Sequence, residues 1–224
     1  MEKTRKATIA VDIETVASPK GLMIIEKTEF KAASNVKDPA KKEAQISEKK
    51  AKAIDRAALS WWTGKAICIS AVGVDNDISK VWYGDDESEV LGGFFDFLAE
   101  MNTHTQLTLT GKNSMNFDFP YLIGRAIELE LGIPSALRAT TNQRMDMPND
   151  VDHIFGRSSR CEQSTSLANY GYAIGIPKTG SGGDVAGMYK EGMWDEISKY
   201  CTQDSMIVAE MLRRYSKVYR LRRL

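Results

Sequence analysis

The 224-residue chain is long enough for one large domain with a full core or for two small ones, and its charges balance. Hydrophobic residues make up 42% and charged residues 27% of the sequence, which is typical of a folded soluble domain and excludes a disordered or fibrous chain. Thirty basic side chains offset thirty acidic ones, so net charge neither indicates nor excludes a nucleic-acid partner. No apolar run approaches the ~20 residues that cross a bilayer. We therefore expect no membrane association.

Three cysteines, Cys68, Cys161 and Cys201, are widely spaced and form no C-x-x-C pair. This pattern favours free thiols in a reducing compartment over a disulfide scaffold or a zinc site. The first six residues, Met-Glu-Lys-Thr-Arg-Lys, lead into a strand pattern rather than an apolar signal core. We therefore expect a cytoplasmic protein.

The stretch at residues 7–15 predicts the strand around which the chain is organised. Ile9, Val11 and Ile13 alternate with smaller or polar residues. Asp12 and Glu14 are two residues apart at its carboxyl end, so both carboxylates point to one face. A cation relieves their repulsion, and oxygen ligands suit Mg²⁺ or Mn²⁺. The alternative is an exposed polar edge of a sheet.

Residues 18–60 predict an insertion after this strand. Ser18-Pro19-Lys20-Gly21 breaks the pattern, and residues 22–38 predict irregular structure. Pro39 can open a helix that reaches about Ser60. This helix is rich in Ala, Lys and Glu, and its lysines predict a solvated face more strongly than a DNA-contacting one.

The remaining pattern indicates strands first and a mostly helical second half. We expect strands at 65–74, 78–84 and 106–110, with a weaker one at 144–147. We expect helices from the acidic run at 85–88 to about 101, from 116 or 117 to the Gly-Ile-Pro stop at 132–134, from 167 to about 175, after the Gly-rich loop 178–183, and from about 195 to 214 or beyond. Together these elements predict one α/β domain with a mixed sheet of about five strands flanked by helices.

Two further positions supply carboxylates. Asp118 follows the strand at 106–110 at the entry to a helix, where an acid alone is most simply a cap. Tyr200 and Asp204 lie four apart on one face of the last helix, beside an apolar stripe. A carboxylate there needs a partner, and a metal ion supplies one. Four such acids suit a two-metal phosphoryl-transfer site, where a tyrosine can orient the attacking water.

The segments 12–15, 113–118 and 200–204 resemble the three exonuclease motifs of the DnaQ-like superfamily of 3′→5′ exonucleases. The string from Thr110 to Leu122 is similar to the second motif of family B DNA polymerase proofreading domains. The chain as a whole resembles stand-alone PolB-like exonucleases, which phages and bacteria often encode. The resemblance implies an RNase H-like fold, one exonuclease domain over 1–224, and a location in a bacterial cell or a phage-infected host.

The position before Tyr200 assigns the subclass. The histidine subclass has its catalytic imidazole five residues before the last acid, but residue 199 is lysine. The resemblance therefore implies the tyrosine (DEDDy) subclass. A phenol with a pKa of ~10 is a poor general base at neutral pH. We expect Tyr200 to orient a metal-bound hydroxide rather than to remove a proton.

The resemblance also implies roles for the acids and two divalent ions, Mg²⁺ or Mn²⁺, as cofactors. Asp12 would bridge both ions. Glu14 and Asp204 would complete the site that holds the nucleophile. Asp118 would act at the second ion. The implied reaction releases nucleoside 5′-monophosphates from the 3′ end of single-stranded DNA.

Three residues are implied to contact the substrate. Thr15 would lie near the 3′ hydroxyl, and Asn113 and Phe117 near the terminal nucleotides. RNA is an alternative substrate, and a catalytically silent nucleic-acid-binding module is an alternative function. A separate polymerase or another replication or repair protein is a possible partner, which the sequence does not identify.

The sequence does not decide which residues would bind the nucleic acid. The basic run from 213 to 223 fits either a track for the phosphate backbone or a solvated tail. Trp61 and Trp62 fit either base stacking or packing. The Gly-rich loop 178–183 lacks the P-loop spacing. A plain connector is the default reading, and a loop that closes over substrate is the alternative.

Overall fold

The computed structural model describes residues 5–138, 150–155, 165–180 and 182–221. The chain divides into two compact units. The first comprises Met1–Glu14 and Ala66–Leu224, and the second is Thr15–Lys65. Strand β1 (Arg5–Ala17) passes from the first unit into the second. The second unit thus lies where the sequence predicts an insertion.

The first unit is built on a mixed sheet, which confirms the predicted fold class. The strand order is β3-β2-β1-β4, with β2 at Gly64–Gly73, β3 at Ser79–Tyr83 and β4 at Thr105–Thr110. Strand β1 pairs in parallel with β4, and β2 pairs antiparallel with β3. The described residues contain four strands. The weaker strand expected at 144–147 lies outside them.

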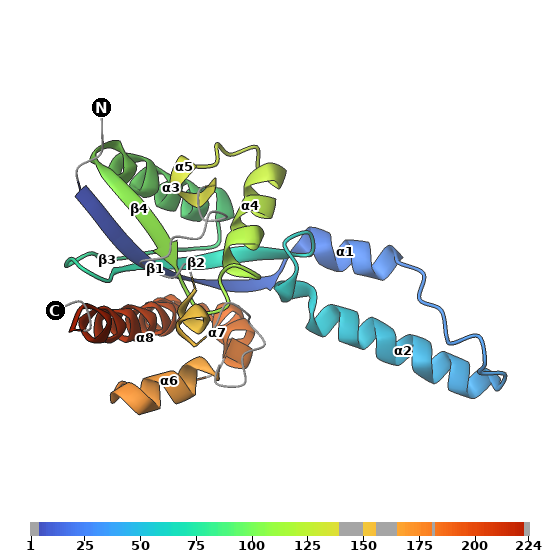
Figure 1. Cartoon of the computed structure of the whole chain (residues 1–224). Coiled ribbons are helices and arrows are strands. Elements are labelled where there is room, and N and C mark those ends of the chain that lie inside the picture. Colours follow the sequence, from blue (N-terminus) through green and yellow to red (C-terminus); the bar gives the residue numbers. More distant parts are fainter. Residues whose placement is uncertain (1–4, 139–149, 156–164, 181, 222–224) are drawn as a thin grey trace. The chain divides into compact units, whose positions relative to one another are not determined.

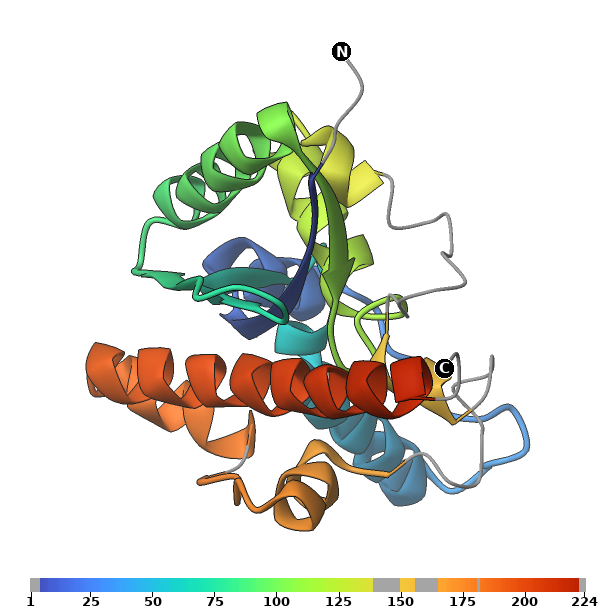
Figure 2. The same ribbon diagram turned by 60° about the vertical axis from the view of Figure 1, so that its left-hand side comes forward.

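The side chains of β1 point alternately into two separate hydrophobic cores. Ile9, Val11 and Ile13 belong to one buried cluster, whereas Ala10 belongs to the other. Successive side chains of a strand point to opposite faces. Helices accordingly cover both faces, with α3, α4 and α5 on one and α6, α7 and α8 on the other (Figure 1, Figure 2).

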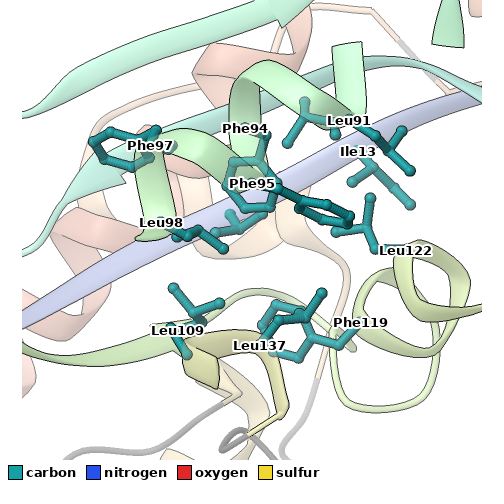
Figure 3. Packing of buried hydrophobic residues seen from close by; sticks show 14 of the residues in the cluster. Ile13, Leu91, Phe94, Phe95, Phe97, Leu98, Leu109, Phe119, Leu122 and Leu137 are labelled. Atoms are coloured by element: carbon teal, nitrogen blue, oxygen red, sulfur yellow. The ribbon is translucent and has the colours of Figure 1, made fainter. Parts of the chain in front are cut away.

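The first core is rich in leucine and aromatic residues. Helices α3 (Glu87–His104), α4 (Asp118–Glu128) and α5 (Ser135–Arg138) supply its outer layer. Phe94 and Phe119 are almost fully buried there (Figure 3). Trp82 meets Phe94 edge to face, with ring centroids 5.4 Å apart. Burying each such side chain contributes roughly 1.5–3 kcal/mol.

A buried ion pair joins α3 to α4. The Arg125 guanidinium donates to both carboxylate oxygens of Glu87, at 2.8 and 2.6 Å. The backbone N–H of Ala66 donates to the same carboxylate at 2.7 Å. Because both side chains are less than a tenth exposed, the pair depends on these mutual hydrogen bonds.

Helix α8 (Trp194–Leu221) covers the opposite face of the sheet. A row of polar contacts, here called the polar seam, joins the two. The Ser70 hydroxyl donates to the Cys201 carbonyl at 2.9 Å and lies 2.7 Å from the Ser205 hydroxyl. The Cys201 thiol lies 3.4 Å from the Asp12 carbonyl oxygen. This seam fixes the face of α8 that meets the end of β1. The other elements on this side are η3 (Val151–Ile154), α6 (Leu167–Ile174), η4 (Gly182–Asp184) and α7 (Val185–Lys190).

The second unit is helical, and two expectations for it were wrong. Helix α1 (Pro19–Lys27) occupies part of the stretch expected to be irregular, because Ser18 caps it by accepting from the Gly21 N–H and proline suits its first turn. Helix α2 (Pro39–Asp55) begins at the predicted proline but stops before Ser60. The chain there turns into the 3₁₀ segment η1 (Ala57–Leu59).

No helix among the described residues is both long and apolar enough to cross a bilayer. The long helix α8 is amphipathic, and its buried face packs in the second core together with α6.

Candidate active site

Strand β1 presents its two acids to the face covered by α8. Asp12 and Glu14 have the same parity as Ala10, which lies in the core on that face. Ligand atoms of Asp12, Glu14 and Cys201 all lie within 4.8 Å of one another. Glu14 is buried and Asp12 is partly exposed. The structure therefore brings the two predicted acids together beside α8.

Asp118 reaches β1 from the first turn of α4. Its Oδ1 accepts the Ile13 N–H at 3.2 Å, and its side chain is buried. Gly111 allows the intervening turn to approach β1, because a Cβ there would lie 2.7 Å from the Val11 carbonyl oxygen. Asn113 adopts a φ of 58°, a conformation that asparagine tolerates better than most residues. The turn thus holds Asp118 against the strand that carries Asp12 and Glu14.

A second layer of acids, which the sequence reasoning missed, supports this turn. Asp150 accepts the N–H groups of Asn113 at 3.1 Å and Asp152 at 3.0 Å. Asp152 in turn pairs with Lys112 at 2.8 Å and accepts from the Tyr170 hydroxyl at 2.8 Å. Asp150, Asp152 and Tyr170 are buried. No spacing in the sequence signals this network, since its members come from three distant segments.

Helix α8 contributes Tyr200 and Asp204, one turn apart and both buried. The Lys178 ammonium forms an ion pair with Asp204 and lies 4.5 Å from the centroid of the Tyr200 ring. The reading of loop 178–183 as a plain connector is therefore wrong for Lys178. A single lysine in an irregular loop has no periodicity, so only the fold could place it beside the acids.

Burial raises the pKa of every acid in the cluster, and repulsion by neighbouring carboxylates adds to the shift of Asp12, Glu14 and Asp118. Burial, followed by the charge of Asp204, raises the pKa of Glu14 to about 8. Burial raises the pKa of Asp118 to about 7, although the Ile13 N–H opposes the shift. The pKa values of Asp12 and Asp204 are also raised, chiefly by burial, and Lys178 opposes both shifts. One ammonium group thus compensates only part of the negative charge.

Two carboxylate oxygens in the cluster lack partners. Asp12 Oδ2 and Asp204 Oδ1 are buried and accept no hydrogen bond from the described residues. An unpaired buried carboxylate oxygen is costly. A divalent cation with oxygen ligands, such as Mg²⁺ or Mn²⁺, fits this donor set. Burial raises the pKa of the neighbouring Cys201 thiol well above its usual range, so it suits a neutral neighbour rather than a ligand.

The three expected substrate contacts lie in different surroundings. Asn113 is exposed, and its side-chain oxygen accepts from Asn116 at 3.0 Å. Phe117 is half-buried, with its ring centroid 5.5 Å from that of Tyr121. Both belong to the turn that carries Asp118. Thr15 belongs to the second unit, and its role stays a prediction.

The basic run at the end of the chain is partly used within the fold. Arg213 donates to the carbonyl oxygens of Gly73 at 2.6 Å and Val74 at 2.8 Å. Arg214 donates to the Ile174 carbonyl oxygen at 2.8 Å. These two side chains therefore anchor α8 rather than belonging to a solvated tail, and the phosphate track stays a prediction.

The fold and the site together define a mixed α/β domain with buried acids gathered at the end of its central strand. Residues 58–215 match the family described as predicted 3′-5′ exonucleases related to the exonuclease domain of PolB, and the chain belongs to this family. The match includes Asn113, Phe117, Asp118, Tyr200 and Asp204. It begins beyond β1, so Asp12 and Glu14 lie outside it.

Two DNA polymerases are similar to this chain, one in sequence and one in fold. The DNA polymerase catalytic subunit of Saimiriine herpesvirus 2 (strain 11) is 27% identical over 60% of this chain and 16% of the viral protein. The family B DNA polymerase of the archaeon Pyrobaculum calidifontis has a similar fold, with a TM-score of 0.53, 16% identity, and coverage of 92% of this chain and 24% of the polymerase. The chain thus spans less than a quarter of either relative's length.

Proposed function

We propose that the chain is a DEDDy 3′→5′ exonuclease that hydrolyses single-stranded DNA from its 3′ end and releases nucleoside 5′-monophosphates. The observation that carries the proposal is the buried acidic cluster, in which one oxygen each of Asp12 and Asp204 accepts no hydrogen bond from the part of the chain that the structure describes. A cluster of this kind is suited to cations rather than to a polar core. Asp12, Glu14, Asp118 and Asp204 would hold two divalent ions, Mg²⁺ or Mn²⁺.

When bound, such ions activate water and neutralise charge on the scissile phosphate. The protein's own groups would do the rest. Burial raises the pKa of Tyr200 to about 12, so the phenol keeps its proton at neutral pH and donates a hydrogen bond that orients the attacking water. The Lys178 ammonium adds positive charge beside Tyr200 and Asp204, where negative charge grows on the phosphate during attack.

The names of the relatives support the proposed preference for DNA. The viral protein and the archaeal protein are both described as DNA polymerases, which favours DNA over RNA. Asn113 and Phe117, on the turn before Asp118, would contact the terminal nucleotides, with Thr15 near the 3′ hydroxyl. A separate polymerase or repair protein would supply the frayed ends.

A gel time course on 5′-labelled single-stranded DNA tests this function. We expect a descending ladder with Mg²⁺ or Mn²⁺ that EDTA abolishes. Asp118→Asn should slow it by at least ~100-fold, in the range of losses seen when a catalytic group is removed. Asp96→Asn, an exposed acid on α3, is the matched control and should keep full activity.

Parallel reactions on RNA of the same sequence separate the alternatives. Faster digestion of RNA would replace DNA with RNA as the substrate. Binding without cleavage of either polymer, by folded protein with either metal, would leave a silent binding module and end the exonuclease proposal.

A further inference from the structure

The side chain of Gln203 forms three hydrogen bonds with the residues on either side of Lys178. Its Oε1 accepts from the Thr179 N–H at 2.9 Å and from the Thr179 hydroxyl at 2.7 Å. Its Nε2 donates to the Pro177 carbonyl oxygen at 3.0 Å. One amide therefore fixes the backbone immediately before and immediately after Lys178.

These hydrogen bonds hold a segment, residues 177–180, that would otherwise be held weakly. Pro177, Thr179 and Gly180 are exposed, whereas the Lys178 side chain is only 14% exposed and turns inward. A lysine side chain has four rotatable bonds and loses much rotamer freedom when ordered. Fixing its Cα on both sides narrows the region that the ammonium can reach.

The segment that follows also passes close to the catalytic tyrosine. A Cβ at Gly180, whose φ is +81°, would lie 3.5 Å from the Tyr200 ring. Tyr200, Gln203 and Asp204 lie within two successive turns of α8. The amide that holds the loop and the two groups that Lys178 contacts are thus carried by one rigid element.

We propose that Gln203 is a positioning residue that holds the Lys178 ammonium between Tyr200 and Asp204. This inference rests on the proposed exonuclease function, because the site that it serves is the same one. Gln203 would not touch the substrate. It would act through Lys178, by keeping one cation of the protein aligned where charge grows on the phosphate.

Gln203→Met tests the role with little change of side-chain volume, since methionine keeps the length of glutamine and removes its hydrogen bonds. We expect kcat on single-stranded DNA to fall about 10-fold with KM changed less than twofold, because small misplacements of an aligned group cost rate more than binding. Gln45→Met is the matched control. Gln45 accepts the Ala33 N–H at 3.1 Å in the second unit, and its loss should leave kcat unchanged.

A double-mutant cycle with Lys178→Met separates positioning from a general structural role. If Gln203 acts through Lys178, Gln203→Met should cost nothing further once Lys178 is methionine. Additive losses would overturn the inference while leaving the exonuclease proposal intact.

A second readout does not need nuclease activity. The Tyr200 ring should shift the NMR signals of the Lys178 Cε methylene, which lies beside the cation over the ring. In Gln203→Met these signals should move toward those of an exposed lysine, and the Thr179 amide should exchange with solvent at least ~10-fold faster. Unchanged signals and exchange would overturn the inference, even in a protein that cleaves neither DNA nor RNA.

Discussion

A metal ion would bind the charged carboxylate of Glu14, whereas the fold without metal favours the protonated acid. Burial raises its pKa from an ordinary 4.5 to about 8. The folded protein therefore holds this proton more tightly than the unfolded chain between those values. The associated stability is present below pH 4.5 and is lost as pH rises through 8.

We expect the thermal midpoint of the protein in EDTA to fall between pH 6 and pH 8.5. Glu14→Gln should flatten this fall and exceed the wild type at pH 8.5 by several degrees, since about 1 kcal/mol corresponds to ~2–4 °C in a chain of this size. Adding Mn²⁺ in place of EDTA should raise the thermal midpoint of the wild type but not that of Glu14→Gln. Calorimetry across this pH range makes the measurement, and an equal fall in both proteins would contradict it.

Individual site residues differ in how far the sequence could predict them. The pairing of Asp12 with Glu14 follows from strand parity alone, and that of Tyr200 with Asp204 from helical spacing. Lys178 could not be found in this way, because the conformation of its loop depends on Gln203, which lies 25 positions further on. Asp150 and Asp152 could not be predicted for the same reason, since their partners are distant in the sequence.

Helices α3 and α4 depend on the buried pair between Glu87 and Arg125. Arg125→Met would leave the Glu87 carboxylate buried with the Ala66 N–H as a remaining donor. Breaking one side of such a pair costs about 3–5 kcal/mol. We expect the free energy of unfolding in urea to fall by that amount. Arg56→Met, at an exposed residue after α2, is the control and should change it little.

The double variant Glu87→Leu with Arg125→Met should regain part of this loss, because it removes the unpaired charge together with its partner. A double variant less stable than Arg125→Met alone would contradict this account of α3 and α4.

At the scale of elements, strong periodicity and capping made the sequence informative. The N-cap Ser166 and the acids at 86–89 mark the starts of α6 and α3. Helix α1 was missed because Ser18-Pro19 reads equally as a chain break and as a cap followed by a first-turn proline. The four-residue segments α5 and η3 are too short to show a period, and they form because neighbouring elements bury Leu137 and Val151.

The molecule consists of units that differ in how their helices are held. In α2, all of whose residues the structure describes, no residue is buried, whereas α4 places seven residues in the interior. A helix of this length that buries none of its residues is marginal in water. We expect α2 amides to exchange with solvent at least ~100-fold faster than those of α4. Mass spectrometry of peptides from both helices measures this.

The variant Asp38→Ala sharpens that comparison. Asp38 accepts the N–H groups of Ala40 and Lys41 at 2.9 and 3.2 Å, so its removal should cost ~1 kcal/mol and speed exchange in α2 alone. Equal protection of the two helices in the wild type would show that α2 is held by more than its own turns.

Strand β1 serves the core with one set of positions and the acidic site with the other. Ile9, Val11 and Ile13 fill the aromatic core, while Asp12 and Glu14 face α8. A substitution in this strand can therefore alter one property and spare the other. A deletion of a single residue cannot, because it exchanges the two faces and drives carboxylates into hydrocarbon. Along this strand, evolution can change residues one at a time but has almost no freedom to change their number.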